Sequence, residues 1–310
     1  MTKTKKIKFV FWRKISGDPV DDYFSDKPQY HAFFMKCSEI FDFRIANNPD
    51  SYVGGGIFGN VYKYQNWKFV PAEKIFKADV VYQRKRLTDE SFDYAVPIID
   101  TPEFKKWCPD KWNQYQLLSR YMPKTFLVQS QEEFIKKLRH ITTKKAVVKP
   151  RRGEKGENVI VFGKNNPPFL DKEILNEKGY LLQEFADTNI KVGGMINSLH
   201  DIKLITIGDK FFANLRIPEQ GKEYCTYNSP YFEISKNVLP ENVVNFYWEI
   251  RETINKAYPN NFYTIDMGIT KKGPVLFELN SHTVFPYMHF SCANEFFDAF
   301  IKTIQLLVRN

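Results

Sequence analysis

The segment from Asn261 to Asn280 constrains the fold most, because it reads as two strands joined by a tight turn. Strand-like runs lie on both sides of Lys271-Lys272-Gly273. A three-residue hairpin loop favours positive φ at its last position, which glycine supplies. With such a loop Thr270 pairs with Pro274, so the pattern predicts a β-hairpin whose register is set by its turn.

This register places two carboxylates opposite each other, those of Asp266 and Glu278. Side chains two residues apart share a face, so Asn280 joins them. Opposed like charges destabilise a sheet, and a divalent cation removes that repulsion. Three oxygen ligands suit Mg²⁺, or Mn²⁺ in its place, better than zinc. The alternative is a solvated acidic edge. The other face is expected to be core, namely Ile265, Met267, Phe277 and Leu279.

Two lysines and a glycine-containing loop form a second candidate group. Lys149 ends an apolar strand, and the charged segment 151–158 with Gly153 and Gly156 follows it. Such a loop can fold over phosphates, offer them N–H groups and cations, and exclude water. Lys111 opens a helix and is a second candidate phosphate ligand, although ordinary strand-end or helix-surface lysines would look the same.

Two strand ends are candidates for ligand contacts. Gln183-Glu184-Phe185 ends the apolar run from Tyr180, and its backbone could contact the edge of an adenine ring. A strand from Ala78 to Tyr82 places Arg84 just beyond its C-terminal end, where ligands of open α/β sheets often lie.

A glycine pattern earlier in the chain does not indicate a nucleotide loop. Gly54, Gly56 and Gly59 match the glycine spacing of dinucleotide and kinase phosphate loops. Those loops need a strand before them and, in the dinucleotide fold, a helix after them. Here a turn-like stretch precedes the glycines and the strand-like run 61–69 follows, so we expect a glycine-rich turn entering a β-hairpin.

Composition limits the class of protein. The chain has 310 residues, 43% of them hydrophobic and 16% aromatic, which suits a globular protein with a sizeable core. The apolar runs are too short for a membrane span or a signal peptide. Four scattered cysteines predict reduced thiols in a cytoplasmic protein. The net charge of +9 comes without a nucleic-acid motif, so anionic small molecules are the preferred explanation over nucleic acid.

The order of elements predicts an α/β (α+β) protein in three parts. Residues 1–105 read as an N-terminal α/β domain, 106–188 as a central α+β subdomain, and 189–310 as a C-terminal α+β subdomain that carries the carboxylate hairpin. The two later parts would flank a cleft. Predicted helices cover 29–41, 111–121, 131–139, 241–258 and 293–308.

From residue 78 onwards the chain resembles the ATP-grasp superfamily, and bacterial glutathione synthetases and related amino-acid or peptide ligases in particular. The matching segments, in order, are Asp79-Val80-Val81 with Arg84, Asp110-Lys111, Val148-Lys149-Pro150, Gln183-Glu184-Phe185, Asp201-Ile202-Lys203, Arg216-Ile217-Pro218, Asn228, Thr264-Ile265-Asp266 and Glu278-Leu279-Asn280. Lys203 stands where the family usually has arginine. Residues 1–77 carry no matching motif.

The resemblance implies an ATP-grasp fold, in which a pre-ATP-grasp domain precedes two subdomains that clasp ATP. It also implies a role for each matched residue. Catalytic roles fall to Arg216 and Lys149. ATP would be bound by Lys111, Lys149, Gly153, Gly156, Gln183, Glu184, Phe185, Asp201, Lys203 and Asn228. Substrates would contact Arg84, Arg216, Asn228 and His282, and Mg²⁺ would be held by Asp266, Glu278 and Asn280.

The implied activity is an ADP-forming carboxylate–amine ligase that works through an acyl-phosphate. Its substrates would be a small-molecule or peptide carboxylate and an amine. Three alternatives stay open: a ligase that modifies a peptide or protein, a kinase that phosphorylates a polyanion, and a nucleotide-binding protein without catalysis. Homo-oligomerisation is also left open.

Overall fold

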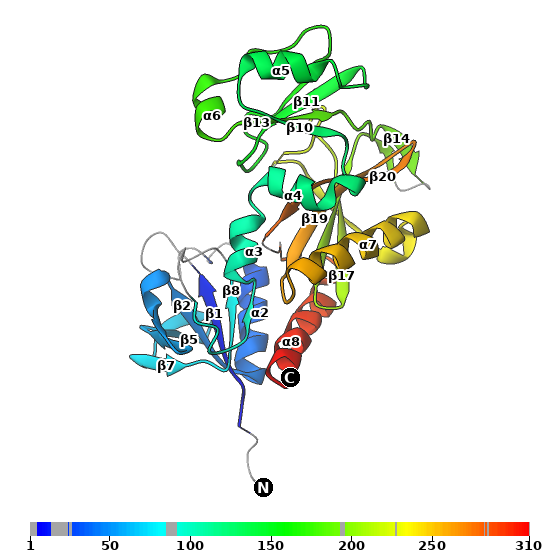
Figure 1. Cartoon of the computed structure of the whole chain (residues 1–310). Coiled ribbons are helices and arrows are strands. Elements are labelled where there is room, and N and C mark those ends of the chain that lie inside the picture. The colour runs from blue at the N-terminus through cyan, green and yellow to red at the C-terminus, as the bar shows by residue number, and fades with distance from the viewer. Residues whose placement is uncertain are drawn as a thin grey trace.

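A computed structural model describes residues 5–13, 24, 27–84, 92–192, 196–226, 228–281, 283 and 285–309. Figure 1 shows an N-terminal part, a central part far from it, and a C-terminal sheet between the two. The chain passes from the first to the second through α3 (Pro102–Trp107) and α4 (Lys111–Leu118), followed by a 3₁₀ turn at Ser119–Tyr121. In the described part, no helix is long and apolar enough to cross a membrane.

The N-terminal part is built on a six-stranded sheet in the order β6-β5-β2-β1-β8-β9, with β2, β1, β8 and β9 parallel. Four consecutive side chains of β1, from Phe9 to Trp12, are fully buried, as expected for a strand covered on both faces. The strands are β1 (Lys8–Arg13), β2 (Asp42–Asn47), β5 (Tyr62–Gln65), β6 (Lys68–Pro71), β8 (Val80–Gln83) and β9 (Ile98–Ile99), and α2 (Pro28–Ile40) packs beside them.

The glycine-rich segment forms the hairpin expected from the sequence. β3 (Tyr52–Gly54) and β4 (Ile57–Gly59) pair antiparallel after a 3₁₀ turn at Pro49–Ser51, and β7 (Ile75–Lys77) completes a small sheet. Gly55 and Gly56 have φ of +63° and +73°, which glycine adopts without strain. The run 61–69, expected as one strand, is a second hairpin that turns at Asn66 and Trp67.

The central part is a four-stranded antiparallel sheet in the order β10-β13-β11-β12, covered by two short helices. Its core is apolar and centred on Phe134, Val148 and Leu182. The elements are β10 (Thr125–Val128), α5 (Gln131–Leu138), β11 (Lys145–Pro150), β12 (Ile160–Gly163), α6 (Lys172–Glu177) and β13 (Tyr180–Glu184).

The C-terminal part is a five-stranded antiparallel sheet in the order β18-β17-β16-β19-β20. One face packs against α7 (Glu241–Ala257), and α3 and α4 add side chains to that core. The strands are β16 (Asp201–Ile207), β17 (Lys210–Arg216), β18 (Tyr231–Ile234), β19 (Tyr263–Thr270) and β20 (Gly273–Asn280), with a 3₁₀ turn at Lys236–Val238. A short hairpin, β14 (Ile190–Val192) and β15 (Ile196–Ser198), precedes them.

The second face of this sheet is divided between core and site. Along β16, Ile205 and Ile207 lie in the same apolar core as α8 (Ala293–Arg309) and the N-terminal sheet. Asp201 and Lys203 continue the same alternating face at the other end of the strand. Thus α8 covers half of the face, and the remaining half carries charged side chains towards the central part.

Candidate active site

The charged half of the C-terminal sheet gathers its side chains by strand register. Asp266 on β19 lies opposite Lys203 on β16 and Glu278 on β20. Arg216 on β17 lies opposite Asp201 on β16. Directly opposed residues share a face, so these five side chains lie together. The predicted pairing of Asp266 with Glu278 is therefore confirmed.

The turn that produces this pairing differs from the prediction. Thr270 pairs with Gly273, not Pro274, so the loop has two residues instead of three. A β-bulge between Asp266 and Met267 on the pairing with β20 restores the predicted register. Because of the bulge, Leu276 is buried in the core and Phe277 lines the cavity. The prediction that Phe277 is a core residue was therefore wrong. Gly268 makes room for Phe277, because a Cβ there would lie 2.6 Å from that ring.

Asp266 is the centre of a buried ion-pair network. Its Oδ1 accepts from Lys203 Nζ at 2.6 Å, and its Oδ2 accepts from Arg216 Nη2 and Asn280 Nδ2, both at 3.2 Å. Arg216 also donates to both oxygens of Asp201, at 2.7 and 2.5 Å. Although burial opposes its charge, the carboxylates of Asp266 and Asp201 raise the pKa of Arg216. A permanent cation is thus fixed in a planar, two-pronged geometry.

The two predicted phosphate lysines lie on the other side of Glu278. Lys111 Nζ is 3.6 Å from Glu278 Oε2 and donates to the carbonyl of Gly153 at 2.7 Å. Lys149 Nζ donates to the carbonyl of Phe277 at 3.2 Å. Burial lowers the pKa of Lys149 to about 8. Burial alone would raise the pKa of Glu278, but the cations around it, Lys111 first, hold that pKa below its usual value.

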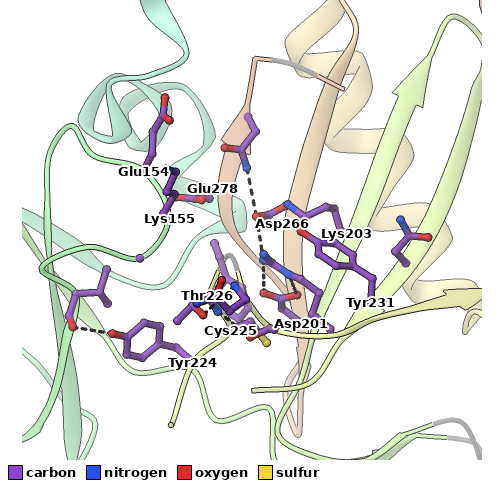
Figure 2. A pocket seen from close by; sticks show the side chains of 18 of the residues that line it. Glu154, Lys155, Asp201, Lys203, Tyr224, Cys225, Thr226, Tyr231, Asp266 and Glu278 are labelled. Atoms are coloured by element: carbon purple, nitrogen blue, oxygen red, sulfur yellow. Dashed lines mark hydrogen bonds and ion pairs between the residues drawn. The ribbon is translucent and has the colours of Figure 1, made fainter. Parts of the chain in front are cut away.

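The loop 151–158 closes one side of the cavity and is held at both ends. At its start Asp110, wholly buried, accepts from Arg151 Nε at 2.8 Å and from Arg152 Nη2 at 3.1 Å. At its end Tyr224 Oη donates to the carbonyl of Val159 at 3.1 Å. Figure 2 shows Glu154 and Lys155 on the loop at one side of the cavity, and Asp266 and Lys203 on the strands at the other side.

The strand end 183–185 lines the same cavity beside the central sheet. Two of its side chains are already engaged: Gln183 Nε2 donates to Thr125 Oγ1 at 2.7 Å, and Glu184 Oε1 accepts from Thr142 N at 2.9 Å. Backbone atoms and the half-buried ring of Phe185 therefore remain as the surfaces that this strand end presents to a ligand.

Arg84 lies at the opposite end of the cavity, just past β8 as predicted. Its guanidinium lies 5.2 Å from the ring of Tyr30 and 5.3 Å from that of Phe285, and Nη1 donates to the carbonyl of Thr283 at 2.9 Å. The buried ammonium of Lys105 donates to the carbonyls of Arg84 and Ser281. These contacts connect the N-terminal part to the chain that leaves β20.

One cavity of about 980 Å³ contains nearly all of the predicted site. That volume is at the upper end for a single small-molecule site, so it offers room for a nucleotide and a further substrate. His282 lies outside the described residues. All other predicted site residues line the cavity: Arg84, Lys111, Lys149, Gly153, Gly156, Gln183, Glu184, Phe185, Asp201, Lys203, Arg216, Asn228, Asp266, Glu278 and Asn280.

Sequence reasoning assigned no role to several residues that the structure brings to this site. Asp110 anchors the loop, and Asn214, Tyr231 and Lys105 line the cavity. Strand alternation could have identified Asn214, since it stands two residues before Arg216. Tyr231 could not have been found in this way, because β18 has only four residues and no clear alternation.

The donor set is compatible with a hard divalent cation. Glu278 is a half-buried carboxylate, Asp266 is shared among three donors, and Asn280 uses its Nδ2 on Asp266, which leaves its amide oxygen available. Oxygen ligands of this kind fit Mg²⁺. Among the described residues, no group of three or more His, Cys, Asp or Glu side chains forms a metal site, so any ion would need Asn280, phosphates or water.

Comparison with solved structures identifies the fold. The D-alanyl-alanine synthetase A of Vibrio cholerae O1 biovar eltor is similar with a TM-score of 0.61 and 11% identity, covering 99% of this chain and 100% of that one. VanG D-Ala:D-Ser ligase of Enterococcus faecalis is similar with a TM-score of 0.61 and 16% identity, covering 97% of this chain and 99% of that one. The ATP-grasp ligase PsnB, complexed with minimal precursor, Mg and ADP, has a TM-score of 0.61 and 12% identity, covering 98% of this chain and 99% of that one.

The chain therefore has the ATP-grasp fold over nearly its whole length. No protein-family model matches the sequence, and no curated protein does.

Proposed function

We propose that this protein is an ATP-dependent, ADP-forming ligase that joins a carboxylate to an amine through an acyl-phosphate. The observation that carries the proposal is the fixed guanidinium of Arg216 in the same cavity as Asp266, Glu278 and two lysines. This set combines phosphate-binding cations with oxygen ligands for a metal. The solved structures with the same fold include D-Ala ligases and a ligase complexed with Mg and ADP.

ATP would lie between the central and C-terminal sheets. The backbone at 183–185 would contact the adenine, with Phe185 against its face. Lys111, Lys149 and the N–H groups of the loop at Gly153 and Gly156 would bind the phosphates, because cations and backbone donors stabilise phosphoryl charge. Asp201 and Lys203 would hold Arg216 and Asp266 in place, and Asn228 would approach from the rim.

Asp266, Glu278 and Asn280 would hold Mg²⁺, which neutralises phosphate charge when bound. In the first step a carboxylate oxygen attacks the γ-phosphorus, the bond to the β-phosphate oxygen breaks, and ADP leaves. The loop 151–158, fixed by Asp110, excludes water from the acyl-phosphate.

In the second step the amine nitrogen attacks the acyl carbon, the bond to phosphate breaks, and the nitrogen loses a proton. Arg216 would stabilise the oxyanion that forms, because a fixed cation costs no reorganisation during the reaction. Arg84, at the far end of the cavity, would bind the carboxylate substrate.

Within this class we propose an amino-acid or peptide ligase similar to glutathione synthetases. The Arg216-Ile217-Pro218 segment and the ending Glu278-Leu279-Asn280 support that choice, and the size of the cavity leaves room for two substrates. The three-part division at residues 105 and 188 is part of the same proposal.

Release of ADP tests the proposal. The protein is incubated with ATP, Mg²⁺ and pools of amino acids, dicarboxylates or N-acetylated peptides, with and without hydroxylamine. We expect one pool to support ADP release and hydroxylamine to yield a hydroxamate, even without an amine. A phosphorylated alcohol with no hydroxamate would identify a kinase instead, and nucleotide binding without any ADP release would identify a binding protein.

A further inference from the structure

We infer that the amine substrate binds between Asn214 and a wall of aromatic side chains, and that it carries an aromatic or other large apolar side chain beside its amino group. This inference rests on the proposed ligase function and names the class of its second substrate. Two independent observations support it, a buried acceptor next to Arg216 and the apolar composition of the adjoining wall.

The buried acceptor is the side-chain amide of Asn214. Asn214 precedes Arg216 by two residues on β17, so both side chains are on the cavity face of the sheet. It is 2% exposed and lines the cavity, yet its Oδ1 accepts no hydrogen bond from any described residue. A buried acceptor without a donor is costly, and an N–H group of a bound amine would satisfy it.

The wall begins next to Arg216. The ring of Tyr231 lies 5.6 Å from the Arg216 guanidinium, and the ring of Tyr287 lies 6.5 Å beyond that of Tyr231. Phe290 packs edge-on against Tyr287 at 5.4 Å. Pro218, Pro230 and Pro286 add apolar surface to the lining of the cavity, while the rings of Tyr30 and Phe285 lie against the guanidinium of Arg84.

The wall is fixed before any ligand binds. Glu233, two residues after Tyr231 on β18, accepts hydrogen bonds from Ser291 N at 2.8 Å and from Cys292 N at 2.9 Å. These bonds hold the segment 285–292 against the sheet. Farther in, the rings of Tyr30 and Phe285 stack at 4.6 Å with an interplanar angle of 9°. A preformed apolar surface loses little conformational freedom when a ligand binds. Burial of apolar area against it therefore contributes more fully to the affinity for that ligand.

The chemistry of this subsite selects the occupant. A small amine such as alanine would satisfy Asn214 but leave the rings in contact with water. A large apolar side chain would fill that space and remove apolar area from water. The apolar surface continues outward, since Tyr287 is 45% and Met288 is 42% exposed. The amine can therefore belong to a free amino acid or to the N-terminus of a peptide.

Amino-acid amides test the inference, because they carry the amine but no carboxylate that could be activated. Titration calorimetry in the presence of Mg²⁺ and a non-hydrolysable ATP analogue would compare phenylalaninamide, alaninamide and lysinamide. We expect phenylalaninamide to bind at least about tenfold more tightly than alaninamide, the ratio for burying part of one aromatic side chain. Phe-Gly-Gly-amide in the same titration distinguishes a free amino acid from a peptide N-terminus as the source of the amine. If it binds more tightly than phenylalaninamide, the substrate is a peptide.

Three variants locate the site. Tyr287→Ala, at an exposed position, should remove most of the preference for phenylalaninamide. Asn214→Leu, which keeps the branching of the side chain but has no acceptor, should weaken the binding of phenylalaninamide and of alaninamide by the same factor. Phe169→Ala, which removes a 92% exposed ring, is the matched control and should change the binding of neither amide. Equal affinity of the wild type for all three amides, or an unchanged preference in Tyr287→Ala, would overturn the inference.

The same amides in the ADP-release assay separate this inference from the ligase proposal. If hydroxylamine yields a hydroxamate but phenylalaninamide accelerates ADP release no more than alaninamide, the amine assignment fails and the ligase proposal stands. If no pool yields a hydroxamate or any ADP release, the ligase proposal itself fails, whatever the amides bind.

Discussion

Two walls of the cavity, one formed by the C-terminal sheet and one by the central sheet, differ in how their buried cations are paired. On the C-terminal sheet Lys203 and Arg216 are ion-paired with Asp266 and Asp201 at 2.5–3.2 Å. On the central sheet Lys149 is also buried, yet within the described part of the chain its ammonium forms no ion pair and donates only to a backbone carbonyl. The cations of the C-terminal wall are thus neutralised within the protein, whereas under the proposed function the phosphates of ATP would supply the counter-charge of Lys149.

The pKa values of the two walls follow this difference. Neighbouring carboxylates raise the pKa of Arg216, whereas burial lowers that of Lys149 to about 8. We infer that the C-terminal wall contributes to folding as well as to chemistry, while the central wall contributes mainly to nucleotide binding. Substitutions on the two walls should therefore separate stability from affinity.

The largest effect is expected for Arg216→Met. Removing one partner of a buried ion-pair network leaves Asp201 and Asp266 partly uncompensated, which typically costs about 3–5 kcal/mol of unfolding free energy. Urea denaturation would measure it, with Arg120→Met, a surface arginine beside Tyr121, as the control. An unchanged midpoint in Arg216→Met would mean that the network does not stabilise the fold.

Glu278→Gln should abolish most turnover while leaving the fold intact. The change removes a proposed metal ligand, worth several kcal/mol of transition-state stabilisation, so we expect a loss of at least about a hundredfold in kcat. It also removes the repulsion between Glu278 and Asp266. The control is Glu295→Gln, a surface glutamate paired with Lys210. Full activity of Glu278→Gln with Mg²⁺ present would refute the metal assignment.

Lys149→Ala should weaken ATP binding without destabilising the protein. The expected loss is about 1.5–3 kcal/mol, the value of a charge-assisted contact to phosphate. Because Lys149 has no ion pair among the described residues, the unfolding free energy should change little. Calorimetric titration with ATP would measure the effect, and Lys137→Ala, a half-exposed lysine of the same subdomain, is the control. An unchanged dissociation constant would remove Lys149 from the site.

The smallest effect is expected for Asp110→Asn. Asparagine still caps α4, but it no longer carries the charge that holds Arg151 and Arg152. Both arginines are partly exposed and screened by solvent, so we expect only about a threefold to tenfold rise in KM for ATP. Asp171→Asn makes the same change at the N-cap of α6, away from any arginine ion pair among the described residues. Equal effects of the two substitutions would show that helix capping alone is responsible.

Local patterns predicted the elements that carry the site better than the contacts between them. The run before Lys149, the helix after Asp110 and the pairing of Asp266 with Glu278 all followed from spacing and turn residues. The pairing was reached through an incorrect loop length, because the turn and the β-bulge shift the register in opposite directions. A bulge leaves no reliable mark in a single sequence.

Contacts between distant segments could not be derived from spacing. Asp201 meets Arg216 because β16 and β17 pair, and Arg216 meets Asp266 only because β19 joins the same sheet. The resemblance gave Arg216 a catalytic role, but the sequence did not show that Asp201 and Asp266 hold its guanidinium. Likewise, the wall formed by Tyr231 and Tyr287 joins an edge strand to a loop more than fifty residues away in the sequence.

The acyl-phosphate can be tested by following an oxygen atom of the carboxylate substrate. If the carboxylate is activated as an acyl-phosphate, one of its oxygens leaves with the phosphate when the amine attacks. Supplying the active pool with ¹⁸O in its carboxylates and analysing the released phosphate by mass spectrometry would trace that atom. We expect released phosphate that carries one ¹⁸O for each amide formed. Amide formation with unlabelled phosphate, or transfer of phosphate to an alcohol, would contradict it.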